Sequence, residues 1–136
     1  MWDDWGVRDA PGLADLARMV VTEDELPVGS VSWHSVYYGP NLGSRSYNIG
    51  IGLAESARGR GIGSTAQRLL AQHLFATTDV QRVEASTDVD NIAEQRALGK
   101  AGFAREGVLR SAQFRSGGWH DLVAFSVLRE ELDDLA

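Results

Sequence analysis

The sequence predicts an α+β domain built on one mixed sheet, antiparallel at both ends and parallel in the middle. Its 136 residues amount to about one domain, so residues 1–136 are treated as a single unit. Segments that alternate β-branched or aromatic residues with others predict strands, and segments with apolar residues at a 3.6-residue period predict helices. Their order is strand, strand, strand, helix, strand, helix, strand, strand, and the helical crossover in the middle favours parallel pairing there.

Three strands are expected before the first helix. They cover residues 18–22, 28–36 and 46–53. Leu26-Pro27 interrupts the chain between the first two, and the loop 39–44 is rich in Gly, Pro, Asn and Ser. Gly50 and Gly52 lie inside the third strand, which indicates a bulge or the close approach of another backbone or a ligand.

The second half of the chain begins with a glycine-rich turn at residues 57–63, which continues into a helix. The expected elements are helix 62–75, strand 82–88, helix 92–101 and strands 103–114 and 119–128. Asn91 opens the second helix and Gly102 ends it. A glycine-containing turn at residues 115–118 joins the last two strands as a hairpin.

The composition excludes several classes of protein. The chain has no cysteine, which excludes disulfides, thiolate catalysis and cysteine-based zinc sites. His34, His73 and His120 lack metal-ligand spacing, so we expect no metal. No apolar run reaches the roughly 18 residues of a membrane span, and the N-terminus lacks the features of a signal peptide. We therefore expect a cytoplasmic protein without a membrane partner.

The charge is unevenly distributed. The net charge of −6 argues against nucleic-acid binding. Residues 58–120, however, carry nine Arg and Lys against six Asp and Glu, whereas both flanking segments are acidic. This basic middle segment suits either a compact polyanion held in a local pocket or a solvated helix face.

The glycine-rich turn predicts a phosphate or pyrophosphate site. Glycines between a strand and a helix let several backbone N–H groups point into one small space. The helix N-terminus adds partial positive charge, and Arg58 and Arg60 flank the turn. Because the turn lies between a predicted strand and a predicted helix, phosphate binding is favoured over a purely structural turn.

Two kinds of phosphate site fit the turn. The segment 61–66 matches Gly-x-Gly-x-x-Ala, the dinucleotide fingerprint, which requires an acidic residue about 20 positions later at a strand end. Asp79 lies near that distance but precedes the next strand, so the dinucleotide interpretation is the weaker one. A Walker-type loop is excluded because no Gly-Lys-Ser/Thr occurs.

The second kind of site rests on a resemblance. Arg58-x-x-Gly61-x-Gly63 resembles the pyrophosphate-arm motif of the GNAT superfamily of N-acetyltransferases, Gln/Arg-x-x-Gly-x-Gly/Ala. The downstream segments 91–93 and 98–103 resemble the helix that follows in that superfamily. Segments 106–110 and 119–121 resemble its RimJ/RimL-type branch, which acetylates protein N-terminal amines and other amines. The resemblance covers residues 18–132 or so.

The resemblance implies acetyl-CoA as cofactor and a fold whose parallel middle strands, 46–53 and 82–88, splay apart to admit the pantetheine arm. The residues implied for cofactor binding are Ile51, Gly52, Leu53, Arg58, Gly59, Arg60, Gly61, Ile62, Gly63, Ser64 and Asn91. Asn91 equally suits a helix N-cap, and both roles are compatible.

The implied activity is transfer of an acetyl group to a primary amine, a peptide N-terminus or a small amine, by direct attack of the amine on the thioester. Relatives often place Glu near Asn48 and Ser or Tyr near Glu94 and Leu98, and this chain has neither. His34, whose ordinary pKa is near neutral, is the first substitute, together with Glu55 and with Glu84 and Glu94, both expected near the cleft. Tyr47 fits the core better, and His120 fits a structural role better. A CoA-binding protein without transferase activity is the alternative, and a nucleotide-dependent oxidoreductase ranks third.

The N-terminal part is shorter than the resemblance implies. Family members begin with a strand and one or two helices, whereas only about 17 residues precede the first clear strand here. We therefore expect the domain to lack the usual first strand and first helix. The unprotected edge of the first strand leads us to expect a homodimer.

Overall fold

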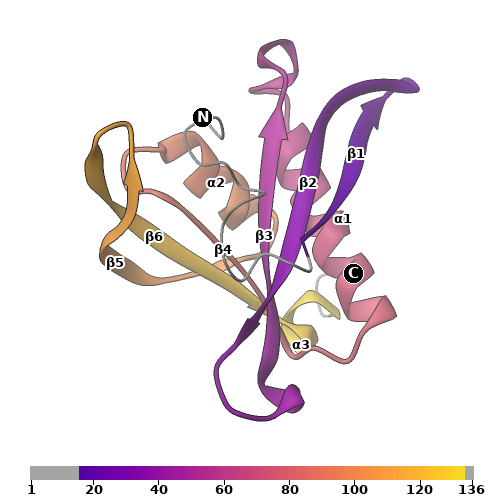
Figure 1. Ribbon diagram of the computed structural model, residues 1–136. Helices are drawn as coiled ribbons and strands as arrows, with labels where there is room; N and C mark the ends of the chain where they lie inside the picture. Colours follow the sequence, from indigo (N-terminus) through magenta and orange to yellow (C-terminus); the bar gives the residue numbers. More distant parts are fainter. Residues whose placement is uncertain (1–15, 134–136) are drawn as a thin grey trace.

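The computed structural model describes residues 16–133, which form six strands and three α-helices around one sheet (Figure 1). In chain order the elements are β1 (Ala17–Glu23), β2 (Leu26–Tyr37), η3 (Leu42–Ser44), β3 (Arg45–Leu53), η4 (Glu55–Ala57), α1 (Ile62–Thr77), β4 (Arg82–Asp88), α2 (Ile92–Lys100), β5 (Ala104–Arg115), β6 (Gly118–Leu128) and α3 (Arg129–Asp133). The predicted fold class and the order of the eight expected elements are confirmed. The expectation about a missing first strand and helix concerns residues 1–15, outside the described residues.

The sheet is mixed, with the spatial order β1-β2-β3-β4-β6-β5. All neighbouring strands are antiparallel except β3 and β4, which run parallel. These two strands pair only at Tyr47 with Val83 and at Asn48 with Glu84. Beyond these pairs β3 and β4 run apart toward the top of Figure 1, as the splayed arrangement requires.

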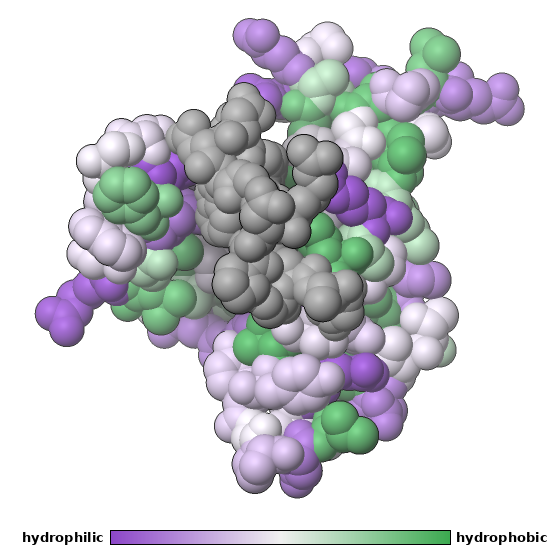
Figure 2. All heavy atoms as spheres, viewed as in Figure 1, coloured by the Kyte–Doolittle hydropathy of each residue, from purple (hydrophilic) through white to green (hydrophobic). Residues whose placement is uncertain are grey.

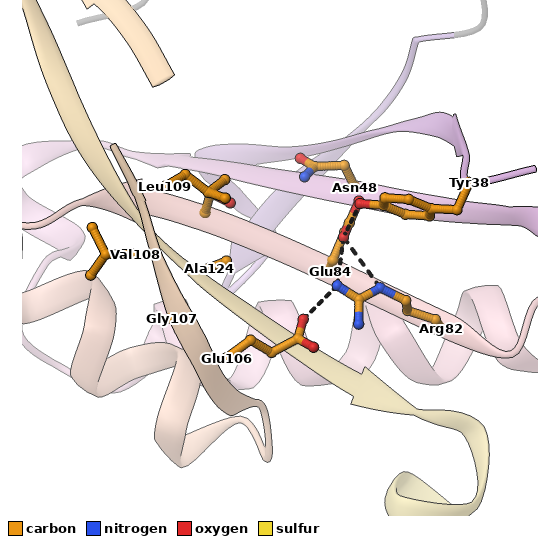
Figure 3. A pocket seen from close by; sticks show the side chains of 10 residues that line it. Tyr38, Asn48, Arg82, Glu84, Glu106, Gly107, Val108, Leu109 and Ala124 are labelled. Carbon is orange, nitrogen blue, oxygen red and sulfur yellow. Dashed lines mark hydrogen bonds and ion pairs between the residues drawn. The ribbon is translucent and has the colours of Figure 1, made fainter. Parts of the chain in front are cut away.

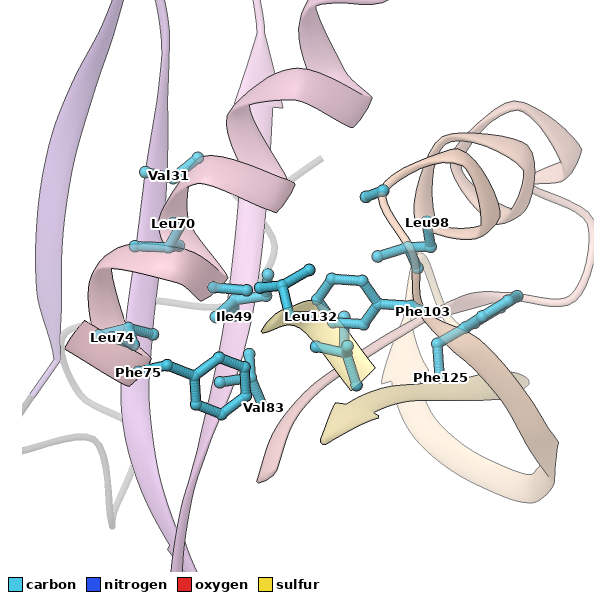
Figure 4. Close-up of a cluster of buried hydrophobic side chains, with 14 of the residues drawn as sticks. Val31, Ile49, Leu70, Leu74, Phe75, Val83, Leu98, Phe103, Phe125 and Leu132 are labelled. Carbon is cyan, nitrogen blue, oxygen red and sulfur yellow. The ribbon is translucent and has the colours of Figure 1, made fainter. Parts of the chain in front are cut away.

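One hydrophobic core lies between the sheet and the helices α1 and α2, which share one face (Figure 4). The sheet contributes alternate residues of its strands, as expected from the two-residue period of a strand. Among the most deeply buried residues are Val31, Ile49, Leu70, Leu74, Val83, Leu98, Phe103, Val123, Phe125 and Val127. The core therefore fixes which side chains of β3 and β4 point away from the helices.

The opposite face of the middle strands is polar. Val83 and Ala85 belong to the core, so Arg82, Glu84 and Ser86 point to the other side. The same alternation places Asn48 beside Glu84, because the two residues are paired across the strands.

Three details differ from expectation. The pairing of β2 with β3 has no irregularity, so the bulge considered at Gly50 and Gly52 is not present there. Leu69, which fits the apolar period of the first helix, is exposed. Helix α3 was not expected. Arg129 at its start donates to the carbonyls of Phe75, Thr78 and Val80 and so holds this short helix against the end of α1.

Within residues 16–133, no helix has both the length and the apolar character that a membrane span requires.

Candidate active site

The divergence of β3 from β4 leaves one edge of β3 without a strand partner. Ile51, Gly52 and Leu53 pair with β2 along their other edge. None of them is paired with β4. Within residues 16–133, the backbone groups on the β4 side other than the Leu53 carbonyl, which accepts from Arg58, are therefore available to an extended ligand in the cleft, where they would pair as a further strand does.

The predicted glycine turn connects this edge to helix α1. Gly59 and Gly61 have φ angles of +76° and +80°, and a Cβ added at either would meet nothing within 4 Å. At Gly63 an added Cβ would meet the Leu53 Cδ1 atom at 3.6 Å. The backbone thus curves around open space at the start of α1. Side chains introduced at Gly59 or Gly61 would enter that space.

Within residues 16–133, no side chain caps the first N–H groups of helix α1. Its N-cap residue is Gly61, no side chain caps it, and its first turn has no acidic residue. The Ser64 hydroxyl donates to the Gly61 carbonyl at 3.1 Å instead of reaching an N–H group. The first N–H groups of a helix have no partner inside the helix, so this end suits an anion.

The two arginines of the turn have different partners. The Arg58 Nε atom donates to the Leu53 carbonyl at 3.2 Å and ties the turn to the end of β3. Arg60 instead forms a two-point ion pair with Glu23, the last residue of β1, at 2.8 and 3.1 Å. An anion on the turn would compete with Glu23 for the Arg60 guanidinium.

Helix α2 begins differently. The Asn91 Oδ1 atom accepts from the Glu94 backbone N–H at 3.2 Å, which confirms the N-cap interpretation of Asn91. Glu94, in the first turn, accepts from the Gln67 Nε2 atom of α1 at 3.1 Å. Burial raises the pKa of Glu94 to about 7. The start of α2 therefore already has an oxygen cap and a carboxyl group, unlike that of α1.

The three catalytic candidates from the sequence are not brought together. His34 pairs with Asn48 across β2 and β3 and shares its face of the sheet. Glu55 is exposed at the start of η4, beyond the end of β3. Glu94 lies between the two helices, on the side of the core. The candidates thus occupy three separate places around the cleft.

A pocket of about 380 Å³ opens on the polar face of the sheet (Figure 3). It is lined by Asn48 from β3, by Arg82, Glu84 and Ser86 from β4, and by Tyr38, Ala124 and residues 106–109. This pocket adjoins the last paired residues of β3 and β4, where the cleft begins.

Glu84 is the centre of the polar contacts in this pocket. The Tyr38 hydroxyl lies 2.8 Å from both carboxylate oxygens of Glu84. The Arg82 guanidinium donates to Glu84 at 2.7 Å and to Glu106 at 2.5 Å. Glu84 is only 8% exposed.

The pocket residues have shifted proton affinities. Burial and the neighbouring Glu84 raise the pKa of Tyr38, so its hydroxyl stays protonated as a donor. The hydrogen bond from Arg82 lowers the pKa of Glu106, which keeps that carboxyl ionised. The Glu84 and Glu106 carboxyl groups both contact the Arg82 guanidinium.

Sequence reasoning placed Glu84 near the cleft but did not identify the group around it. Tyr38 and Glu84 are 46 positions apart, and Glu106 comes from a third strand. The available signal was the alternation of strand 82–88, which puts Glu84 on the face opposite Val83.

Comparison with known proteins agrees with this arrangement. Residues 4–104 match the family model described as the acetyltransferase (GNAT) domain. The probable N-acetyltransferase YjcK of Bacillus subtilis is 30% identical over 108 residues, covering 79% of this chain and 58% of that protein. The ribosomal-protein-serine acetyltransferase of Escherichia coli is 30% identical over 104 residues, covering 76% of this chain and 55% of that protein.

A similar solved structure is Mycobacterium smegmatis RimJ in complex with CoA-disulfide. It is 29% identical, with a TM-score of 0.77 over 86% of this chain and 55% of that one. This chain thus spans little more than half the length of these relatives. The splayed strands, the glycine turn and the family match over most of the sequence lead to one conclusion: the chain belongs to the GNAT family of acetyltransferase domains.

Proposed function

We propose that the chain binds acetyl-CoA and transfers its acetyl group to a primary amine. The observation that carries this proposal is the free edge of β3 leading directly to a glycine-rich, uncapped helix start. A long ligand with an extended arm and an anionic middle fits both parts at once. The open space at Gly59 and Gly61 supports the fit of a pyrophosphate.

The residues proposed to hold the cofactor follow its length. Ile51, Gly52 and Leu53 offer their free backbone edge to the pantetheine arm. The pyrophosphate would lie against the turn and the first helical residues, which are Arg58, Gly59, Arg60, Gly61, Ile62, Gly63 and Ser64. Asn91, whose side chain caps α2, is the last residue proposed to contact the cofactor.

When bound, acetyl-CoA supplies an acetyl group activated as a thioester. A backbone N–H on the free edge of β3, within Ile51–Leu53, would donate to the acetyl carbonyl oxygen, where negative charge develops during transfer. For proton transfer we retain His34, Glu55 and Glu94 as candidates. His34 shares the polar face with Asn48, whereas Glu94 is hydrogen-bonded to Gln67 between α1 and α2.

The acceptor we propose is the amine of a peptide N-terminus or of a small molecule. The relative from Escherichia coli, a ribosomal-protein-serine acetyltransferase, supports a protein acceptor. Because acetyl-CoA is an intracellular metabolite, the proposal also places the protein in the cytoplasm.

Two measurements test the proposal. Titration calorimetry should show binding of acetyl-CoA and CoA and none of NADH or NADPH. Thiol release from acetyl-CoA should then depend on an added amine, across a panel that includes peptides with free N-termini. Binding without amine-dependent release would favour the alternative, a CoA-binding protein without transferase activity. Asn48 supports this alternative, because an amide cannot act as a base. Binding of NADH alone would contradict both.

A further inference from the structure

The pocket beside Glu84 meets the cofactor cleft at one point. Asn48 and Glu84 are the last pair that joins β3 to β4, and both line the pocket. Beyond this pair the strands separate. An amine in the pocket and a thioester in the cleft would therefore meet beside this pair.

The charges in the pocket suit a cation. Two carboxyl groups, Glu84 and Glu106, share the single Arg82 guanidinium. Leu109 and Ala124 supply apolar surface. A primary ammonium group on a short apolar arm matches this combination of charge and surface.

The hydrogen bonds of Glu84 leave room for such a group. Arg82 donates from Nε and Nη2 to the Oε2 atom only, at 3.2 and 2.7 Å. The Tyr38 hydroxyl lies within reach of both oxygens but has one proton to give. The Oε1 atom therefore has acceptor capacity left, and Glu84 lines the pocket.

We infer that Glu84 receives the acceptor amine and acts as its base, with Tyr38 and Arg82 as positioning residues. This inference rests on the proposed function. Glu84 would supply the carboxyl group that relatives often place near position 48, where this chain has Asn. The acceptor class is a primary amine that arrives as ammonium, on an arm short enough for a pocket of about 380 Å³.

The proposed step balances. The ammonium gives one proton to the Glu84 carboxylate, and the neutral nitrogen attacks the thioester carbonyl carbon. The N–C bond forms and the C–S bond breaks, so the sulfur leaves as thiolate. The second nitrogen proton goes to the thiolate, which gives free thiol and the amide. Glu84 then releases its proton to water.

Steady-state kinetics of Glu84→Gln tests this role, because glutamine keeps the shape and can still accept from Tyr38. We expect kcat/KM for the acceptor to fall about 100-fold or more, whereas the affinity for CoA measured by calorimetry stays unchanged. The remaining activity should rise with pH up to the pKa of the acceptor itself. Asp79→Asn, which removes one carboxylate from a fully exposed side chain, is the matched control and should change neither quantity.

The outcomes separate the two levels of the proposal. If the parent chain binds CoA and releases thiol but Glu84→Gln keeps its kcat/KM and pH profile, the inference is overturned and the proposed function stands. If the parent chain binds no CoA, the proposed function itself fails. If Glu84→Gln does not fold, Tyr38→Phe is measured instead. The acidic limb of its pH profile of kcat/KM for the acceptor must shift, whereas its CoA affinity stays unchanged. An unshifted limb overturns the inference.

Discussion

Gln67 in the second turn of α1 and Glu94 in the first turn of α2 are joined by a hydrogen bond from the Gln67 Nε2 atom to the Glu94 Oε1 atom at 3.1 Å. The same Nε2 atom also donates to the Gly63 carbonyl at 3.1 Å. Gln67 is fully buried, and its Oε1 atom has no hydrogen-bond partner among the described residues. A protonated Glu94 has a proton to offer in this neighbourhood, whereas an ionised Glu94 has none.

The first prediction concerns stability against pH. Because burial raises the pKa of Glu94 to about 7, the folded state holds this proton over a range in which the unfolded state has lost it. Stability should therefore fall as the pH rises from about 4.5 through 7. Glu94→Gln removes this loss and gives the unpaired Gln67 oxygen an amide donor.

We expect Glu94→Gln to be more stable than the parent at pH 8 by roughly 1–3 kcal/mol and to differ little at pH 4.5. Chemical denaturation at the two pH values measures the difference. An equal difference at both values would show that the ionisation of Glu94 is not its cause.

The second prediction concerns the glycine turn. Gly61→Val places a side chain in the open space at the start of α1 and should abolish CoA binding. Its positive φ also strains any substituted residue, at a cost of roughly 1–3 kcal/mol. Gly117→Val is the matched control, since Gly117 has φ +79° and equally open surroundings in the β5–β6 hairpin. Calorimetry with CoA should separate two variants of similar thermal stability, and equal CoA affinity in both would show the turn to be structural only.

The third prediction concerns the competition for Arg60. Glu23 holds the Arg60 guanidinium at two points in the absence of ligand. Glu23→Gln should release it for the pyrophosphate and tighten CoA binding by up to about tenfold, the size of one charge-assisted contact. In an Arg60→Ala background the same change should have no effect. A double-mutant cycle measured by calorimetry at low salt checks this, and additive effects of the two substitutions would rule out the competition.

The fourth prediction concerns self-association. Strand β1 lies at the edge of the sheet, and hydrophobic surface is visible near the β1–β2 end in Figure 2. Val20 on this strand is 67% exposed. We predict a twofold dimer that continues the sheet through β1, which Val20→Lys should dissociate and Val20→Thr should preserve. Sedimentation equilibrium at high micromolar concentration gives the mass, and a monomeric parent chain would contradict the prediction.

Most helices and strands could be predicted because their periodicity and capping residues lie within short, continuous segments of the sequence. The period of strand 82–88 gave its bounds, and Asn91 marked the start of α2 through its own side chain. Helix α3 was missed because its five residues are too few to show a helical period, and its position depends on the contacts of Arg129.

The site divides in the same way. The glycine turn is one continuous segment, so its conformation could be anticipated from Gly59 and Gly61. The pocket around Glu84 depends on which strands pair, and on Tyr38 and Glu106 reaching the same carboxyl group and guanidinium. Alternation along one strand indicates a face but not the neighbours on that face.

The two residue pairs between β3 and β4 also have a mechanical consequence. They are the only backbone ladder contacts between β1-β2-β3 and β4-β6-β5 within residues 16–133, so the sheet consists of two three-stranded halves with a narrow joint at Tyr47 and Asn48. A ligand hydrogen-bonded along the free edge of β3 and lying beside β4 would restrict the motion of one half-sheet relative to the other. Its binding should slow amide exchange at Ile51–Leu53, and the ends of both half-sheets should stiffen together.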